Sequence, residues 1–334
     1  MVLSSPSPHL FGPRERLLNI IVNNELLELS DFVEICGRVR ARAPHIHIFL
    51  GNPASVAEQV SQNLWALPAL TIGVGTPVGS FTPKRGDLIY NKTVSKLDQK
   101  AILQAKSVRT LRTARFDPKE NYDPALWGEF VILKPAPLHM TSDGQNVRMI
   151  RTSRLKEIST TQKLADWLGT TAPLLVQSFV DTGPRPICWR VLTLFGHALY
   201  SLRTVSPIAR PSLSASDEEI ESATIVSKHI DWEDVYDFSD MLFLESKPEI
   251  LEFARQVAGC FPRIPLLGVD ILQHHETGEL FALEINAGGN TWHFSSKAAA
   301  SGRTAVGREA RMEQFGAWDV AARALIEASD KFSR

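Results

Sequence analysis

Two short stretches near the carboxyl end of the chain decide its fold, Gly268-Val269-Asp270-Ile271-Leu272 and Ala282-Leu283-Glu284-Ile285-Asn286. Each places polar residues in apolar, strand-like sequence, and the residues between them, His274–Gly278, have the composition of a turn. A turn centred on Thr277 sets Asp270 directly opposite Glu284. Because side chains on a strand alternate between faces, Asn286 then lies on the same face as Glu284. The sequence therefore predicts a hairpin that brings two carboxylates and an amide together.

Two carboxylates in direct cross-strand contact repel each other, unless a cation lies between them or one of them is protonated. The residues leave three alternatives: a metal site, an acid pair that shares a proton, and an exposed hairpin. Oxygen ligands that are few in number suit Mg²⁺, which keeps some water and takes other ligands from nucleotide phosphates. The apolar neighbours of both acids favour a functional pair over an exposed hairpin.

An earlier hairpin carries two arginines. The segments Trp189–Leu194 and Ala198–Arg203 flank Gly196-His197, and a two-residue loop with glycine first is a common hairpin connection. This register sets Arg190 opposite Arg203. Like charges at such positions destabilise a sheet. Either an anion such as phosphate lies between the two guanidinium groups, or both groups face solvent and diverge; both alternatives stay open.

Other segments set the order of elements around these hairpins. The apolar strand Phe130–Leu133 ends in Lys134, since the proline that follows interrupts a strand ladder. A loop with Ser, Asp and Gly at 136–146 and a strand at Leu174–Val180 come next. One helix over about Arg308–Lys331 ends the chain.

The composition is that of an ordinary globular protein. With 334 residues the chain is long enough for two or three lobes, and 44% of its residues are hydrophobic against 22% charged. Residues 1–15 indicate a loose arm, and residues 16–93 alternate apolar and helical runs, which is typical of a small open α/β domain. With a net charge of -1, the chain has no overall field that would attract nucleic acid. Its apolar runs are all shorter than the ~20 residues that cross a membrane, so we expect neither a nucleic-acid nor a membrane partner. We therefore expect a cytoplasmic protein.

A lysine at a strand end, a hinge-like segment, paired arginines and an Asp–Glu–Asn cluster follow one another in this chain. In this order they resemble the ATP-grasp superfamily, which includes D-alanine–D-alanine ligase, glutathione synthetase and ribosomal-protein glutamate ligases. The resemblance covers roughly residues 94–290. It implies a fold class of α+β and α/β: two α+β lobes that clasp ATP, at about 94–175 and 176–334, after a small open α/β domain at 16–93.

The resemblance also implies the site residues. Asp270, Glu284 and Asn286 correspond to the metal cluster, for one or two Mg²⁺ ions with Mn²⁺ as a substitute. Arg190 and Arg203 correspond to catalytic arginines near the transferred phosphoryl group. The nucleotide-binding positions are Lys96, with Lys100 as the neighbouring alternative, Lys134, Ser142, Gly144, Gln177, Ser178, Phe179, Val180 and Asp181. Of these, the segment 176–180 corresponds to the hinge between the lobes, whose backbone reads adenine, and Asp181 is the candidate for binding the ribose. The departures from many members include Gln177, where they have glutamate, and Gly268, where they have arginine.

The chemistry that the resemblance implies is that of an ADP-producing ligase. A carboxylate would be joined to an amine, or to another nucleophile, through an acyl phosphate made from ATP. The alternatives are a small-molecule kinase with the same nucleotide site and a non-catalytic ATP-binding regulatory module. The expected partners are small-molecule or peptide carboxylates and amines, and a second copy of the chain, since many members are dimers or tetramers.

Overall fold

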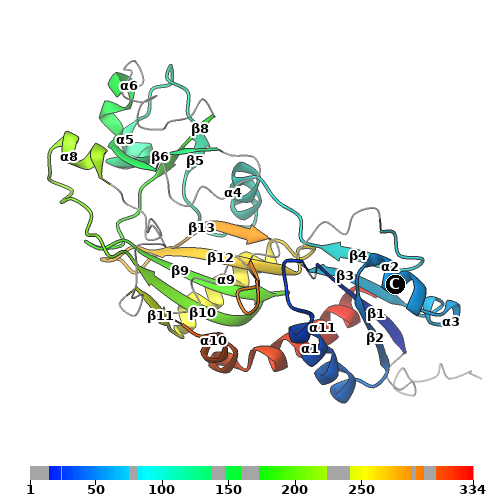
Figure 1. Ribbon diagram of the computed structural model, residues 1–334. Helices are drawn as coiled ribbons and strands as arrows, with labels where there is room; N and C mark the ends of the chain where they lie inside the picture. The colour runs from blue at the N-terminus through cyan, green and yellow to red at the C-terminus, as the bar shows by residue number, and fades with distance from the viewer. Residues whose placement is uncertain are drawn as a thin grey trace, which may run out of the picture.

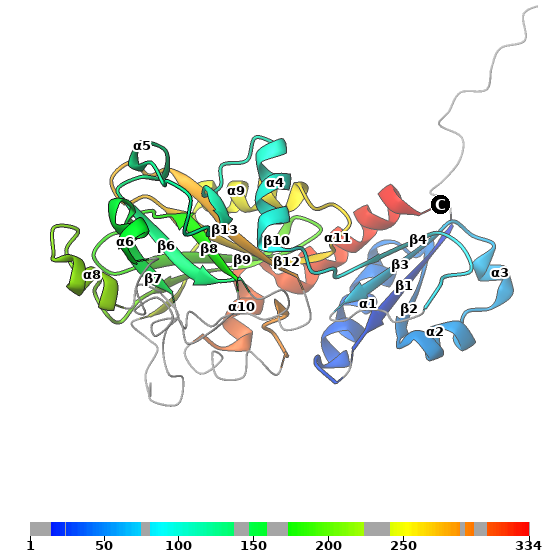
Figure 2. The same cartoon turned by 90° about the horizontal axis from the view of Figure 1, so that it is seen from above.

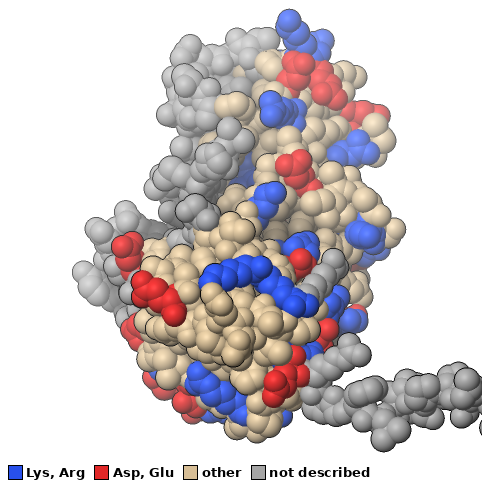
Figure 3. Space-filling view, turned by 90° about the vertical axis from the view of Figure 1, so that its right-hand side faces the viewer, with Lys and Arg blue, Asp and Glu red and all other residues tan. Residues whose placement is uncertain are grey.

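The computed structural model describes residues 15–23, 25–74, 81–136, 147–158, 173–223, 241–287, 291–296 and 306–333. Its strands form three sheets, which lie in separate parts of the molecule (Figure 1). Within the described ranges, every helix is too short or too polar to traverse a lipid bilayer. On the face seen in Figure 3, Lys and Arg side chains occur together with Asp and Glu, in keeping with the net charge of -1.

The N-terminal sheet is parallel and has the strand order β2-β1-β3-β4. Helices that connect parallel strands cover the faces of the sheet, so the two central strands, β1 and β3, are apolar and almost entirely buried. Phe32, Ile35 and Val39 of α1 pack in this core. The elements are β1 (Arg16–Val22), α1 (Leu29–Arg42), β2 (Ile46–Gly51), α2 (Pro53–Gln59), α3 (Gln62–Trp65), β3 (Ala69–Val74) and β4 (Asp87–Tyr90).

The second, smaller sheet is antiparallel, in the order β5-β8-β6-β7. It has a core of its own, in which Trp127, Val131, Leu133 and Val176 are buried. Its elements, preceded by α4 (Lys96–Ala105), are β5 (Thr113–Arg115), α5 (Pro124–Trp127), β6 (Phe130–Pro135), β7 (Arg148–Arg151), η1 (Thr152–Arg154), α6 (Leu155–Ile158) and β8 (Leu174–Ser178).

The large sheet is antiparallel, in the order β11-β10-β9-β12-β13. On one face Trp189, Val191 and Val269 pack against Phe253 and Val257 of α9. The opposite face packs against α10 and α11. The elements are β9 (Ile187–Leu194), β10 (His197–Val205), α8 (Asp217–Ser222), β11 (Leu242–Leu244), α9 (Pro248–Gly259), β12 (Leu266–Gln273), β13 (Leu280–Ala287), α10 (Arg308–Phe315) and α11 (Ala317–Phe332).

Gly316 separates the last two helices. Its φ of 66° is left-handed, a conformation that glycine adopts at little cost and that a continuous helix excludes. The single helix expected over Arg308–Lys331 is therefore wrong at this residue. After the break, α11 runs from the large sheet to the N-terminal sheet, where it contacts α1 and β3 (Figure 2).

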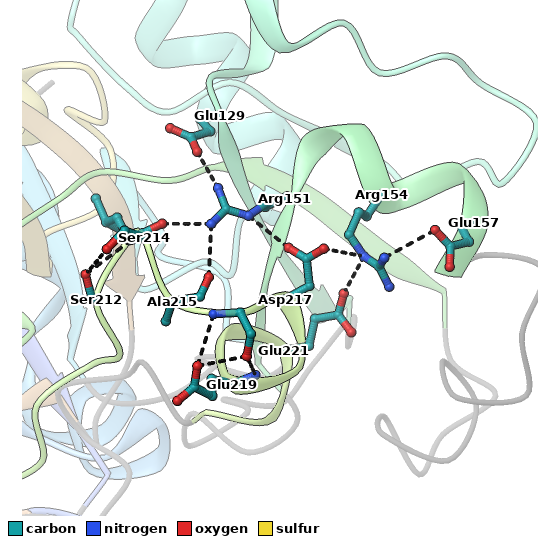
Figure 4. Close-up of polar contacts among 12 residues, drawn as sticks. Glu129, Arg151, Arg154, Glu157, Ser212, Ser214, Ala215, Asp217, Glu219 and Glu221 are labelled. Atoms are coloured by element: carbon teal, nitrogen blue, oxygen red, sulfur yellow. Dashed lines mark hydrogen bonds and ion pairs between the residues drawn. The ribbon is translucent and has the colours of Figure 1, made fainter.

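An ion-pair cluster ties α8 to the small sheet (Figure 4). Arg151 Nε donates to Asp217 Oδ1 at 2.8 Å, and Arg154 Nε lies 3.0 Å from Glu221 Oε1 and 3.2 Å from Asp217 Oδ2. The Glu221 side chain is buried, so this ion pair is partly desolvated. Because α8 follows β10 in the chain, the cluster connects the small sheet to the large one.

Candidate functional site

The predicted acid pair is present. Strands β12 and β13 place Asp270 directly opposite Glu284, and this part of the predicted register is confirmed. Asn286 lies on the same face, with its Nδ2 3.0 Å from Asp270 Oδ2. Asp270 is only 1% exposed, and an isolated carboxylate at such a position would be costly. The hairpin therefore concentrates two acids and an amide at one partly buried point.

Arg190 compensates the buried charge of Asp270. It lies opposite Asp270 on the neighbouring strand β9, and its Nε and Nη2 each donate to one carboxylate oxygen at 2.7 Å. Burial by itself lowers the pKa of Arg190, but the charge and hydrogen bonds of Asp270 outweigh it and raise that pKa above its ordinary value. This bidentate pair was not predicted, because no turn joins β9 to β12.

The predicted pairing of Arg190 with Arg203 is wrong. The turn consists of Phe195-Gly196, both with positive φ (49° and 85°), rather than of the predicted Gly196-His197. A bulge over Ala198–Tyr200 then shifts the register again, so that Arg190 lies opposite Leu202. A one-residue shift moves a side chain to the other face of a sheet, and Arg203 consequently points away from Arg190.

Arg203 has a structural environment of its own. It lies opposite Trp189 on the face that α9 covers. Its Nε donates to Glu245, and its guanidinium group lies 4.5 Å from the ring centroid of Phe243. These contacts place Arg203 among aromatic side chains, apart from the acid pair.

Helix α4 brings Lys96 beside Glu284. The side chain of Gln99 donates to Ile285 O at 3.1 Å and accepts from Ile285 N at 2.9 Å. It thus satisfies backbone groups of β13, which is the edge strand of the sheet as described. This contact holds the first turn of α4 against β13, so that Lys96 Nζ lies 3.3 Å from Glu284 Oε2.

Lys134 reaches the same region from the small sheet. It is 7% exposed, and its Nζ donates to Gln177 Oε1 at 2.8 Å. Burial lowers the pKa of Lys134 to about 8, with the positive charge of Lys96 acting in the same direction and Glu284 opposing it. Gln177 in turn donates to Thr113 Oγ1 at 2.9 Å. A neutral amide, rather than an acid, therefore holds this lysine, and its positive charge is available to an anion.

Lys100, the alternative to Lys96, anchors the helix instead. It is 4% exposed and donates to Thr110 Oγ1 at 2.9 Å, to Ala282 O at 2.8 Å, and to Leu283 O. Burial lowers the pKa of Lys100 to about 7, and the nearby lysines add to this effect. Its protons are directed at the backbone of β13 rather than toward Glu284.

Lys100 should make the stability of the protein pH-dependent. Its folded pKa of about 7 lies below the ordinary 10.5, so between these values the unfolded chain binds more protons and the free energy of unfolding rises with pH. Lys100→Met lacks the titrating group. We expect urea unfolding to show wild type gaining stability relative to this variant from about pH 7 to about pH 9. Parallel pH curves for the two proteins would refute this assignment.

Backbone amides of the expected hinge, residues 176–180, donate hydrogen bonds within the protein. Ser178 N donates to Arg112 O at 2.9 Å, and Phe179 N donates to Phe130 O at 3.2 Å. The side chain of Val180 is buried. A role of these residues in reading adenine stays a prediction.

Asp181, the ribose candidate, already has a cationic partner. Arg210 Nη2 lies 2.8 Å from each of its carboxylate oxygens, and Gly183 N donates to Oδ1 at 2.9 Å. Burial alone would raise the pKa of Asp181, but the hydrogen bonds from Arg210 and Gly183 lower it overall. The predicted loop residues Ser142 and Gly144 lie outside the described residues.

The donor set of the hairpin fits a magnesium ion. It consists of the carboxylates of Asp270 and Glu284 and the amide of Asn286, whose nitrogen is turned toward Asp270. In the described ranges, no group of three or more His, Cys, Asp and Glu side chains is placed to hold a metal ion. Few oxygen ligands match Mg²⁺, which takes water and substrate phosphates as its remaining ligands.

Comparison with solved structures gives the fold. The chain is similar to the ATP-grasp ligase PsnB complexed with precursor peptide PsnA2 and AMPPNP, with a TM-score of 0.50 and 14% identity, over 94% of this chain and 98% of that one. It is also similar to D-cycloserine synthetase DcsG, with a TM-score of 0.46 and 13% identity, over 94% and 99%. A third similar structure is D-alanine–D-alanine ligase from Bacillus anthracis complexed with ATP, with a TM-score of 0.43 and 10% identity, over 95% and 98%.

At the level of sequence, no protein-family model matches the chain, and no curated protein matches it either. The structural likeness extends over nearly the whole of both chains. The chain therefore has the ATP-grasp fold, as the order of its motifs implied.

Proposed function

We propose that the chain is an ATP- and Mg²⁺-dependent ligase that joins a carboxylate to an amine, or to another nucleophile, through an acyl phosphate. The observation that carries this proposal is the setting of Glu284. It lies opposite Asp270 on the large sheet, and the charges of Lys96 and of Lys134 from the small sheet act at the same point. One region thus combines oxygen ligands for a cation with lysines for phosphate.

In the first step, a carboxylate oxygen of the acid attacks the γ-phosphorus, and the bond to the bridging oxygen breaks to release ADP. This transfer needs positioning and neutralisation of charge more than covalent help from the protein. Lys96 and Lys134 would neutralise phosphate oxygens. Asp270, Glu284 and Asn286 would hold Mg²⁺, which supplies further charge neutralisation at the β- and γ-phosphates.

In the second step, the nucleophile attacks the acyl carbon and the phosphate leaves with the electrons of its bond. Arg190 uses Nε and Nη2 for Asp270 and keeps its side chain 19% exposed. Its Nη1 is therefore the atom that would contact the transferred phosphoryl group. Arg190 would act as a fixed positive charge in both steps, since a guanidinium group stays protonated.

A screen for phosphate release tests the proposal. Pools of small acids, amino acids and peptides would be incubated with the protein, ATP and Mg²⁺, and active pools resolved by mass analysis; peptides are included because PsnB is complexed with a precursor peptide. A ligase yields free phosphate and a condensed product. A kinase leaves phosphate on its substrate, and a binding module shows no turnover with any pool; either result would replace the proposal.

Lys134→Ala should weaken ATP binding about tenfold or more, because a charge-assisted hydrogen bond to phosphate is lost at a buried position. Calorimetric titration with ATP and Mg²⁺ measures this effect. Lys119→Ala is the matched control, since Lys119 is an exposed lysine of the same part of the chain. ATP affinity in Lys134→Ala equal to that of the control would remove Lys134 from the site.

A further inference from the structure

Residues 206–222, from the end of β10 to the end of α8, form a segment that we call the strap. It begins on the large sheet, because β10 pairs with β9, the strand that carries Arg190. It ends on the small sheet, where α8 packs against β7 (Figure 4). The strap therefore joins the two sheets that supply the residues of the candidate site.

The first half of the strap runs beside the direct connection between the two sheets, residues 179–186, which joins β8 to β9. The backbone amides of Ser206 and Arg210 each donate to a carbonyl oxygen of this connection at 2.8 Å. Arg210 also pairs with Asp181 of the connection, and its side chain is only 9% exposed. Because the two segments are bonded to each other, they restrain the relative movement of the sheets more than a single connection would.

The second half of the strap is fastened to the small sheet by ion pairs. Asp217 of α8 pairs with both Arg151 and Arg154, and Glu221 pairs with Arg154. Arg151 Nη2 also donates to two backbone oxygens of the strap, at 2.8 and 3.2 Å. In these pairs the strap supplies the acids and the small sheet supplies the arginines.

These contacts act on the strand that carries Lys134. Strand β7, which precedes the two arginines, pairs with β6. Ile220 of α8 is fully buried and belongs to the same apolar cluster as Phe130 of β6. Lys134 lies on β6 as well. The position of Lys134 relative to Glu284 therefore depends on how the strap holds the small sheet.

The acids of the strap are the residues to exchange in an experiment. The side chain of Glu221 is 2% exposed and that of Arg154 is 29% exposed. Loss of the arginine would leave a buried carboxylate without a cation, which is strongly destabilising. Exchange of the acids for amides instead leaves neutral groups on α8, and the partly exposed arginines can be hydrated.

We propose that the strap positions the small sheet for nucleotide binding, with Asp217 and Glu221 as positioning residues that act through it on Lys134. This inference rests on the proposed function, in which Lys134 and the acid pair bind the same ATP molecule. A nucleotide that needs both sheets binds only the arrangement that presents both, and its apparent affinity falls with the fraction of molecules in that arrangement. The strap keeps that fraction high before ATP binds.

The variant Asp217→Asn/Glu221→Gln removes both charges and keeps the shapes of the side chains. We expect it to bind Mg·ATP about tenfold more weakly than wild type in calorimetric titration, as follows when about one molecule in ten keeps the competent arrangement. Glu218→Gln is the matched control, because Glu218 is an exposed acid of the same helix. The control should keep wild-type affinity.

A distance measurement between the sheets distinguishes positioning from a purely structural role. Nitroxide labels at Leu126→Cys of α5 and Arg255→Cys of α9 use two exposed positions. Cys260→Ser removes the one partly exposed native thiol, since Cys36 and Cys188 are buried. By pulsed electron paramagnetic resonance without nucleotide, we expect one narrow distance distribution with the native strap and a broad one after the double exchange. Mg·ATP should narrow the broad distribution, whereas a change in stability alone would leave it unaltered.

Two results would overturn the role of the strap while wild type still binds Mg·ATP: an affinity of the double variant equal to that of Glu218→Gln, or a distance distribution that the exchange leaves unchanged. If the double variant does not fold, Asp217→Asn alone replaces it and is judged by the same two results, because the Asp217 side chain is 33% exposed. A wild-type chain that binds no Mg·ATP would instead overturn the proposed function, and this inference with it.

Discussion

Glu284→Gln is expected to reduce ATP turnover at least about 100-fold while the fold stays intact. The exchange removes one negative charge from the metal cluster and keeps the shape of the side chain. Metal ligation contributes several kcal/mol to phosphoryl transfer, and each 1.36 kcal/mol changes a rate about tenfold. Glu284 is partly exposed and pairs with Lys96 at 3.3 Å, and ion pairs of this kind contribute little to stability.

Glu279→Gln is the matched control for this experiment. Glu279 belongs to the same hairpin, is 47% exposed on its side chain and pairs with Arg109 away from the acid pair. It should keep wild-type turnover. Near-normal ATP consumption by Glu284→Gln, with the far-ultraviolet spectrum of both variants unchanged, would exclude Glu284 as a metal ligand.

Arg190→Ala is expected to destabilise the protein by about 3–5 kcal/mol, because it leaves the buried carboxylate of Asp270 without its cation. Asn286 still donates a hydrogen bond to that carboxylate. Urea unfolding measures the loss. If Asp270 is a metal ligand, Mg²⁺ with ATP should stabilise Arg190→Ala more than it stabilises wild type, since the ion supplies the missing positive charge.

Two further variants make the comparison specific. Arg255→Ala removes an exposed arginine of α9 and should leave stability unchanged. Arg190→Ala combined with Asp270→Asn removes both charges, so it should be more stable than Arg190→Ala alone. Stability of Arg190→Ala equal to that of wild type would disprove the account of the buried pair.

The acid pair was predictable because both strands belong to one hairpin. A short turn fixes the register between neighbouring strands, and the apolar residues around Asp270 and Glu284 indicate that both strands are buried. The fold class was implied by a family resemblance, which rests on the same hairpin and on the order of Lys134, the arginines and the acids. These features can be read from neighbouring residues or from the order of motifs along the chain, and the structure confirms the fold that they imply.

The arginines show where such reasoning fails. The bulge over Ala198–Tyr200 adds one residue to β10, and no turn residue or periodicity marks it. That single residue moves Arg203 to the α9 face. The pair of Arg190 with Asp270 requires β9 and β12 to be neighbours, which is a property of the whole sheet.

Binding of ATP with and without Mg²⁺, measured by calorimetry on wild type and Glu284→Gln, tests the central claim most directly. We expect wild type to bind ATP and to bind it at least about tenfold more tightly when Mg²⁺ is present, and Glu284→Gln to lose this dependence on Mg²⁺. The account would be contradicted by a wild-type protein that binds no ATP at millimolar concentration, or whose ATP affinity is the same with and without Mg²⁺.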